Sequence, residues 1–396
     1  MKVLVITNLY PEKENLEEDK NTKAIHNIIK NWKADVEVIK TRFFPTRKDY
    51  KLSRLKLKAG KFLLENVKVH SISIFKIPMK EIYFTNTFLR YVNKMNFVPD
   101  VIVAHRLPSA KIASILAKTL NKPYIVGLHY SDISNKKKLE KNHKIVEQAE
   151  LIACRSNPIL AEFNKVYPNL SNKCFLASSG IEKHIIVNLN ENLSKLQSWK
   201  EEKRPIKFIT AANLISRKNI DINLKALALI DKRIEWTYTI IGDGPQMNEL
   251  VKLSLDLGIS ERITFLGQKS RKEVLTHMQN SDIFIMVSSH ETFGLTYIEA
   301  MAKGCIVVGA YNNGIDGIVK DGFNGFLCNE KCKTELKNTL VNIIKMDISN
   351  LITVVEKSYL TINNNTEDIV SQVYEGKVWK AFEKGNTVSN NYRLRK

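Results

Sequence analysis

Short apolar runs rich in branched residues alternate with amphipathic stretches along the first half of the chain. The runs have the length and composition of buried strands, and between them apolar residues such as Ile25, Ile28 and Ile29 recur with helical spacing. No hairpin signal is present, so the alternation predicts an α/β fold with a parallel, doubly wound sheet. The predicted strands are 1–9, 34–40, 69–75, 101–104, 122–128 and 151–154, and the predicted helices are 21–32, 110–120, 141–148 and 157–165, with the leucine-bearing segment 45–66 helical or a loop followed by a helix.

A polar stretch separates this half from a second one of the same kind. Residues 189–204 show no strand signal, and the apolar pattern starts afresh at 206–211. We therefore place the first domain at 1–197 and the second at 203–367. The second domain is predicted to hold strands at 206–211, 236–241, 262–266, 282–287 and 305–308 and helices at 219–230, 246–257, 271–279 and 298–302. A last helix is predicted at 368–384, and the tail that follows it, 385–396, is expected to fray.

The composition fits a protein of the cytoplasm. The 396 residues are enough for two domains, and no apolar run approaches the roughly 18 residues that a bilayer span requires. The amino terminus lacks the small-residue cleavage site of a signal peptide. Five cysteines, an odd number, indicate a reducing compartment, and Cys328 and Cys332 have no neighbouring pair to complete a zinc site.

The net charge of +20 is concentrated in the first half of the chain. Residues 1–200 hold 35 Lys and Arg against 18 Asp and Glu, and the densest part, 42–68, holds nine basic and two acidic residues. Such a face suits nucleic acid, an anionic membrane or an anionic acceptor, and a solvated basic surface is the structural alternative. No signature of a nucleic-acid-binding fold accompanies the charge, so we expect no nucleic acid and a peripheral location on the inner face of the cell membrane.

One stretch, 288–304 (SSHETFGLTYIEAMAKG), follows a buried strand and opens a helix. Glu291 and Glu299 flank the turn at Phe293-Gly294, at the edge of a parallel sheet where ligands bind. Gly294 allows a ligand to approach the backbone, and the amides that open the helix offer an anion site. These features suit a molecule with hydroxyls and phosphates, such as a nucleotide sugar. The alternatives are a capping box, Thr296-x-x-Glu299, and a solvated loop carboxylate at Glu291.

Other phosphate-binding motifs are missing or incomplete. The turn 242–245 (GDGP), which contains Gly244, lacks the third glycine of a dinucleotide fingerprint, and no P-loop sequence occurs. No Asp-x-Asp pair occurs either, so we expect neither a metal nor another cofactor. Basic side chains must then neutralise the charge on a diphosphate. Arg217 and Lys218 are the candidates, because the helix dipole does not favour basic residues where a helix starts, although a solvated turn is the alternative.

These motifs resemble retaining glycosyltransferases of family 4, of the type that builds bacterial cell-surface polysaccharides. The 288–304 stretch is similar to the family's E-x7-E signature, including the Phe-Gly and the Glu-Ala-Met-Ala-x-Gly tail. LGISERITFLG, GDGP and IVKDGFNGFL resemble the rest of its carboxyl domain, and AHRLPSAKIASILAK, LHYSDI and SSGIE resemble its amino domain. The resemblance implies a GT-B fold, with two Rossmann-like domains facing a cleft and a terminal helix, about 368–396, that crosses back to the first domain.

The same resemblance assigns roles to individual residues. It implies that Glu291 contacts the donor hexose, that Glu299 binds the ribose and that Lys218 holds the diphosphate, with His129 approaching the donor sugar from the other domain. Sugar hydroxyls and phosphate would bond the backbone amides of Phe293, Gly294, Leu295 and Thr296, and Gly244 and Asn213 are expected to bind the donor as well. The chain departs from the family at Asn213, where arginine is usual and Arg217 could supply the charge, at 21–23, where a glycine-rich loop is usual, and at Gly317, where glutamate is frequent.

The sequence therefore predicts a retaining, metal-independent hexosyltransferase. It would move a hexose from a nucleotide diphosphate sugar, with UDP as the expected nucleotide, to a hydroxyl of a lipid-linked oligosaccharide or polysaccharide precursor. Retention without a carboxylate nucleophile implies front-face attack through an oxocarbenium-like state. The alternative is a catalytically inactive protein of the same fold that binds sugar nucleotides or acts as a scaffold.

Overall fold

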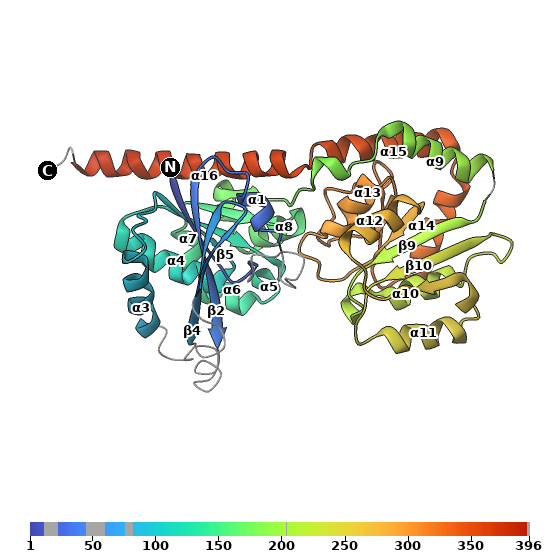
Figure 1. Ribbon diagram of the computed structural model, residues 1–396, viewed down its shortest axis with the longest axis horizontal. Helices are drawn as coiled ribbons and strands as arrows, with labels where there is room; N and C mark the ends of the chain where they lie inside the picture. Colours follow the sequence, from blue (N-terminus) through green and yellow to red (C-terminus); the bar gives the residue numbers. More distant parts are fainter. Residues whose placement is uncertain (12–22, 45–59, 76–81, 203, 394–396) are drawn as a thin grey trace. The chain divides into compact units, whose positions relative to one another are not determined.

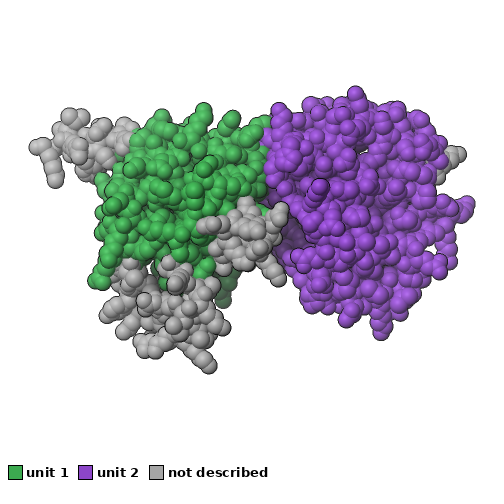
Figure 2. Space-filling model, viewed as in Figure 1, with its two compact units in different colours: residues 1–155, 159–179, 367–396 green, residues 156–158, 180–366 purple. Residues whose placement is uncertain are grey.

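The structure is a computed structural model that describes residues 1–11, 23–44, 60–75, 82–202 and 204–393. The chain forms two compact units (Figure 2). Unit 1 consists of residues 1–155, 159–179 and 367–396, and unit 2 of residues 156–158 and 180–366. Among the described residues, no helix combines the length and the apolar character that a bilayer crossing needs. Each unit is built around its own sheet (Figure 1).

The sheet of unit 1 has the doubly wound strand order β3-β4-β2-β1-β5-β6-β7-β8. All neighbouring strands except β3 and β4 are parallel. The central strands are buried on both faces, which explains why they read as continuous apolar runs. The strands are β1 (Lys2–Thr7), β2 (Asp35–Phe44), β3 (Lys61–Leu64), β4 (Val67–Phe75), β5 (Val101–His105), β6 (Tyr124–Leu128), β7 (Leu151–Cys154) and β8 (Cys174–Leu176).

The edge of this sheet corrects two sequence predictions. β3 pairs with β4 in an antiparallel hairpin, although no hairpin signal was recognised, and 61–64 is a strand rather than part of a helix. The turn residues Glu65 and Asn66 have φ of 42° and 72°. Two left-handed central residues are the geometry of a tight hairpin turn, which Asn tolerates well, so Asn66 was the available signal. The rest of the predicted helical segment, 45–59, lies outside the described residues.

Helices cover both faces of this sheet (Figure 1). On one face of the sheet, an apolar core lies between the strands and the helices α3, α4, α7 and α8. On the other face, a second core lies between the strands and the helices α1 and α16. α16 extends to Arg393, beyond the end predicted at 384. The helices are α1 (His26–Ile29), α3 (Ile82–Asn93), α4 (Leu107–Leu120), α5 (Tyr130–Ile133), α6 (Lys136–Lys141), α7 (His143–Glu147), α8 (Asn157–Val166) and α16 (Glu367–Arg393).

Unit 2 repeats the plan with six parallel strands in the order β11-β10-β9-β12-β13-β14. α12 and α13 share one core with the sheet, and α10, α11 and α14 share the core on the other face. The strands are β9 (Ile206–Ala211), β10 (Trp236–Ile241), β11 (Ile263–Phe265), β12 (Ile283–Ile285), β13 (Ile306–Ala310) and β14 (Phe326–Cys328), and the helices are α9 (Leu189–Glu201), α10 (Ile220–Leu227), α11 (Met247–Asp256), α12 (Arg271–Gln279), α13 (Leu295–Ala302), α14 (Lys333–Lys345) and α15 (Ile348–Asn363). The predicted fold class, two doubly wound parallel-sheet units, is confirmed.

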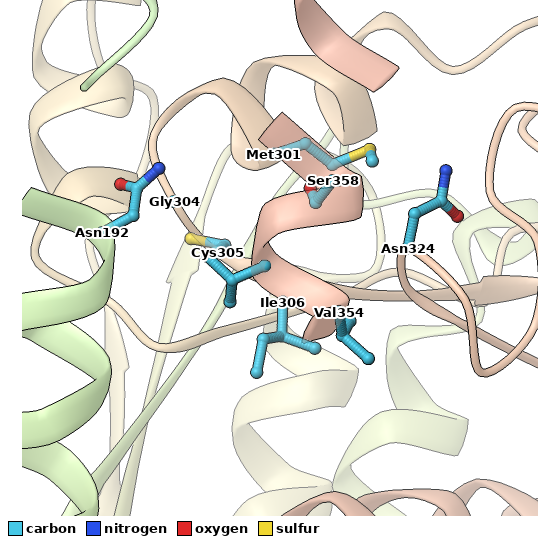
Figure 3. Close-up of a pocket in the computed structure, with 9 residues that line it drawn as sticks. Asn192, Met301, Gly304, Cys305, Ile306, Asn324, Val354 and Ser358 are labelled. Carbon is cyan, nitrogen blue, oxygen red and sulfur yellow. The ribbon is translucent and has the colours of Figure 1, made fainter. Parts of the chain in front are cut away.

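The polar stretch taken as the domain junction is the helix α9, which packs on unit 2. Leu196 and Trp199 are buried in the core of unit 2. Asn192 lies against Gly304 at the end of α13 (Figure 3), where a Cβ on Gly304 would come within 2.0 Å of the Asn192 side chain. Residues 180–197, assigned to the first domain from the sequence, thus belong to unit 2.

Candidate active site at the carboxyl edge of the second sheet

The strand order of unit 2 reverses at β9. The chain proceeds from β9 to β10 and β11 on one side, and then returns to place β12 on the other side of β9. Ligands of doubly wound sheets bind at the carboxyl ends of the strands where this reversal occurs. The loop after β9 contains Arg217 and Lys218, and the loop after β12 contains Glu291. The topology therefore brings Arg217 and Lys218 next to Glu291, which lies more than seventy positions later in the sequence.

Lys218 and Glu291 form a close ion pair at this position. Lys218 Nζ lies 2.5 Å from Glu291 Oε2, and an Arg217 guanidinium nitrogen lies 3.2 Å from the same oxygen. The side chains of Lys218 and Glu291 are 11% and 14% exposed, whereas that of Arg217 is 41% exposed. Burial lowers the pKa of Lys218 and the adjacent Glu291 raises it, with burial the larger effect. The pair is thus a shielded ammonium held next to a carboxylate.

Asn219 joins the two loops. It adopts a left-handed backbone conformation, with φ of 51°, between Lys218 and α10. Its side-chain amide donates to the Val287 carbonyl at 2.7 Å and to Ser289 Oγ at 2.9 Å, and the Ser289 amide donates to the Arg217 carbonyl at 2.7 Å. These bonds fix the loop after β9 to the end of β12, so the Lys218 and Glu291 side chains start from a defined backbone. The sequence analysis gave Asn219 no role.

The turn at Phe293-Gly294 is tightly constrained. Gly294 has φ of 84°, and a Cβ there would lie 2.5 Å from the ring of Tyr297. The Tyr297 hydroxyl donates to the Met286 carbonyl at the end of β12, and Phe293 is buried. Only glycine fits this position, and it begins α13 as its N-cap. The first amides of the helix, at Leu295 and Thr296, are therefore held at the same edge as Glu291, where a helix start favours an anion.

Glu299 is a nearly buried carboxylate on α13. Its side chain is 10% exposed, and Arg271 Nε of α12 donates to Glu299 Oε1 at 2.8 Å. Burial raises the pKa of Glu299, and the neighbouring Arg271 opposes that rise. The N-cap of α13 is Gly294, and the third helical residue is Tyr297, so the capping box proposed for Thr296 and Glu299 is wrong.

The GDGP turn has a structural reason for its glycines. A Cβ on Gly242 would lie 1.9 Å from the Ala212 carbonyl oxygen, and one on Gly244 would lie 2.4 Å from that of Leu214. The Leu214 amide donates to the Asp243 carbonyl at 2.9 Å, so the loop after β9 lies directly on this turn. Asn213 is exposed in the same loop. Gly244 thus supports the backbone that leads to Lys218.

His129 belongs to unit 1, whereas Glu291 and Lys218 belong to unit 2. It follows β6, and its Nε2 lies 3.5 Å from Nδ1 of His105 at the end of β5. Burial, and then the neighbouring His105, Arg155 and Arg106, lower the pKa of His129 well below its usual value. Burial and these neighbours therefore disfavour the charged form of His129, and its part in the reaction stays a prediction.

The described residues contain no group of three or more His, Cys, Asp and Glu side chains arranged to hold a metal ion. Cys328 and Cys332, whose spacing drew attention in the sequence, are free thiols, and Cys328 is buried. The pocket in Figure 3 is lined by residues of α9, α13, β13 and α15 and contains none of the candidate site residues.

The comparisons with known proteins concern the fold of the chain and the sequence of unit 2. The fold is that of the GT-B glycosyltransferases: the Anabaena HepE structure in complex with UDP and glucose has a TM-score of 0.70 and 18% identity, over 96% of this chain and 100% of that one. Residues 193–356, which lie within unit 2, match the family described as glycosyl transferases group 1.

Two relatives are similar to larger parts of the sequence. A glycosyltransferase of Methanocaldococcus jannaschii, itself uncharacterized, is 27% identical over 62% of this chain and 65% of its own length. The N-acetyl-alpha-D-glucosaminyl L-malate synthase of Bacillus anthracis is 23% identical over 70% of this chain and 74% of its own. The chain thus covers just under two thirds of the first relative. The match to the family described as glycosyl transferases group 1 lies in the unit that holds Lys218, Glu291 and Glu299.

Proposed function

We propose that the protein is a retaining glycosyltransferase that transfers a hexose from a UDP-sugar to a hydroxyl of a membrane-linked oligosaccharide or polysaccharide precursor. The observation that carries the proposal is the largely shielded ion pair of Lys218 and Glu291 at the point where the strand order reverses. The match to the glycosyl transferases group 1 family covers this unit, and the HepE structure of the same fold holds UDP.

The charges of the site suit a leaving diphosphate. Lys218 and Arg217 provide two cations, and the opening amides of α13 add partial positive charge. Donors held in place before the reaction stabilise charge that develops in the transition state, and burial strengthens the effect. We propose that this set carries the charge of the diphosphate without a metal ion, while Glu299 binds the ribose.

We propose that Glu291 orients the hexose rather than attacks it. Lys218 and Arg217 both donate to one Glu291 oxygen, and these charge-assisted bonds stabilise the carboxylate and make it a weaker nucleophile. We propose that Glu291 bonds a sugar hydroxyl through its remaining acceptor capacity, so that the acceptor hydroxyl attacks on the face from which the diphosphate leaves. The basic first half of the chain supports an acceptor at a membrane surface, and the role of 45–59 in that contact rests on sequence alone.

The test is release of nucleoside diphosphate from a panel of donors: UDP-glucose, UDP-galactose, UDP-N-acetylglucosamine, GDP-mannose and ADP-glucose. We expect turnover with a UDP-sugar. Glu291→Ala should lower kcat by roughly 10²-fold or more while UDP still binds, because the lost contact orients the sugar and not the nucleotide. The exposed Glu249 of α11 supplies the matched control, Glu249→Ala, with unchanged kcat. Binding of UDP without turnover of any donor would instead favour the inactive binding protein.

A further inference from the structure

Arg271 lies at the start of α12, a position where a helix does not favour a cation. It is the first residue of α12, and a positive charge at a helix amino terminus is opposed by the helix dipole. Backbone amides at the helix start already have hydrogen-bond partners, because Ser270 and Glu273 form a capping box. The position of Arg271 thus has no local explanation, and its contacts lie elsewhere in unit 2.

The guanidinium of Arg271 joins two carboxylates from distant parts of the sequence. Its Nε donates to Glu299 at 2.8 Å, and its two terminal nitrogens donate to the two oxygens of Glu182 at 2.7 and 2.6 Å. The two parallel hydrogen bonds to Glu182 fix the plane of the guanidinium. Because Nε lies in that plane, its hydrogen bond to Glu299 Oε1 also has a fixed direction. Lysine could not reproduce this arrangement, because its single ammonium has no planar fork.

The bridge leaves one side of Glu299 for a ligand. Arg271 occupies Oε1, and no hydrogen bond from another described residue reaches Oε2. With its side chain only 10% exposed, Glu299 has little freedom to choose another rotamer while Arg271 holds it. A carboxylate with one fixed oxygen and one available oxygen is a suitable acceptor for a vicinal diol, such as the 2′- and 3′-hydroxyls of a ribose.

We propose that Arg271, itself anchored by Glu182, is a positioning residue that holds Glu299 in the geometry that recognises the ribose diol of the nucleotide. This inference rests on the proposed function, since it needs a nucleotide at this edge of the sheet. Arg271 acts through Glu299 and does not touch the reacting atoms. Its effect on affinity therefore depends on both the diol and the Glu299 carboxylate being present.

The test compares UDP with 2′,3′-dideoxy-UDP by calorimetry, and ADP and GDP with their dideoxy forms in parallel. Arg271→Ala should weaken binding of the ribose nucleotide about tenfold or more, while the dideoxy nucleotide, which lacks the diol, should bind wild type and variant within about twofold. In a Glu299→Gln background the Arg271→Ala penalty should largely disappear, because the two residues act as one unit. Arg271→Lys and Glu182→Gln should each give a smaller loss of the same diol-dependent kind.

Two controls separate this role from a loss of structure. The exposed Arg233, paired with Asp231, gives a matched variant, Arg233→Ala, that should change neither affinity. Melting temperatures show whether Arg271→Ala remains folded, and Glu182→Gln tests the bridge with less risk to the fold. An equal penalty on ribose and dideoxy nucleotides in both bridge variants would overturn the positioning role and leave the proposed function intact. Failure of the wild-type protein to bind any of the three nucleotides would overturn both.

Discussion

Glu291→Gln is the perturbation that best tests the electrostatics of the site. The substitution keeps the shape of the side chain but removes the charge that lies 2.5 Å from Lys218. The Lys218 side chain is 11% exposed, and its other hydrogen-bond partner among the described residues is Met286 Sδ at 3.7 Å, so the variant retains an almost buried ammonium without a counter-charge. Breaking a fully buried pair costs about 3–5 kcal/mol, and the residual exposure here reduces the expected loss to about 2 kcal/mol. For a unit of this size that corresponds to a fall of roughly 4–8 °C in melting temperature at pH 7.

The loss should depend on pH in a defined direction. Burial already lowers the pKa of Lys218, and Glu291 opposes that effect, so removing the carboxylate lowers this pKa further. Between the folded and unfolded pKa values, the unfolded chain binds more protons than the folded one, and the contribution of Lys218 to stability therefore rises with pH. The loss of stability in the variant relative to wild type should be largest near pH 7. It should shrink as pH rises toward 10, because a neutral amine needs no counter-charge.

The assay is thermal unfolding of wild type and variant side by side at each pH, which cancels the pH dependence of all other groups. Glu249→Gln, on the exposed face of α11, is the matched control and should show no deficit. The double variant Lys218→Met, Glu291→Gln should recover most of the stability, since it removes both charges. A deficit of equal size at pH 7 and pH 10 would show that the unpaired ammonium is not its cause, and the reasoning would be refuted.

Three other results are expected. Arg217→Ala should weaken UDP binding by about 1–2 kcal/mol in calorimetry, because the Arg217 guanidinium faces the same site. Unchanged affinity would mean that Arg217 is a surface residue and that Lys218 acts alone. Gly294→Ala should lower the melting temperature and reduce turnover, since a side chain at φ of 84° costs roughly 1–2 kcal/mol and would press on Tyr297; normal stability would mean that the loop relaxes. The protein should bind anionic liposomes less well as salt rises, at ~1 kcal/mol per engaged basic residue, and equal binding to neutral liposomes would contradict this. In that assay the binding should be lost when glutamine replaces five basic residues that lie outside the described residues: Lys48, Lys51, Arg54, Lys56 and Lys58.

Local pattern was enough to predict the class of fold. Strands buried on both faces must be apolar along their length, so runs such as 206–211 and 101–104 stand out in the sequence without any knowledge of their neighbours. The start of α13 could be predicted as well, because Gly294 and the residues around it are constrained by the backbone of one short segment.

Several elements escaped the sequence analysis for reasons that are also local. α9 is polar overall, and its buried side chains, Leu196 and Trp199 among them, form only a narrow stripe on one side of the helix. The short strands β8 and β14, of three residues each, carry too few positions to show a period. α3, α14 and α15 were not predicted either, although α14 and α15 bury regularly spaced apolar residues.

The pairing of charges was decided by the tertiary structure alone. Glu291 is 73 residues from Lys218, and Arg271 is 89 residues from Glu182 and 28 from Glu299. A sequence shows that such residues carry charge, but the distance between two side chains depends on which strands become neighbours. Strand order is set by the burial of whole sheet faces and by the handedness of the crossovers, which are properties of the folded chain. The sequence therefore determined which residues could build a site, and only the packed sheet determined that Lys218 meets Glu291 and that Arg271 meets Glu299.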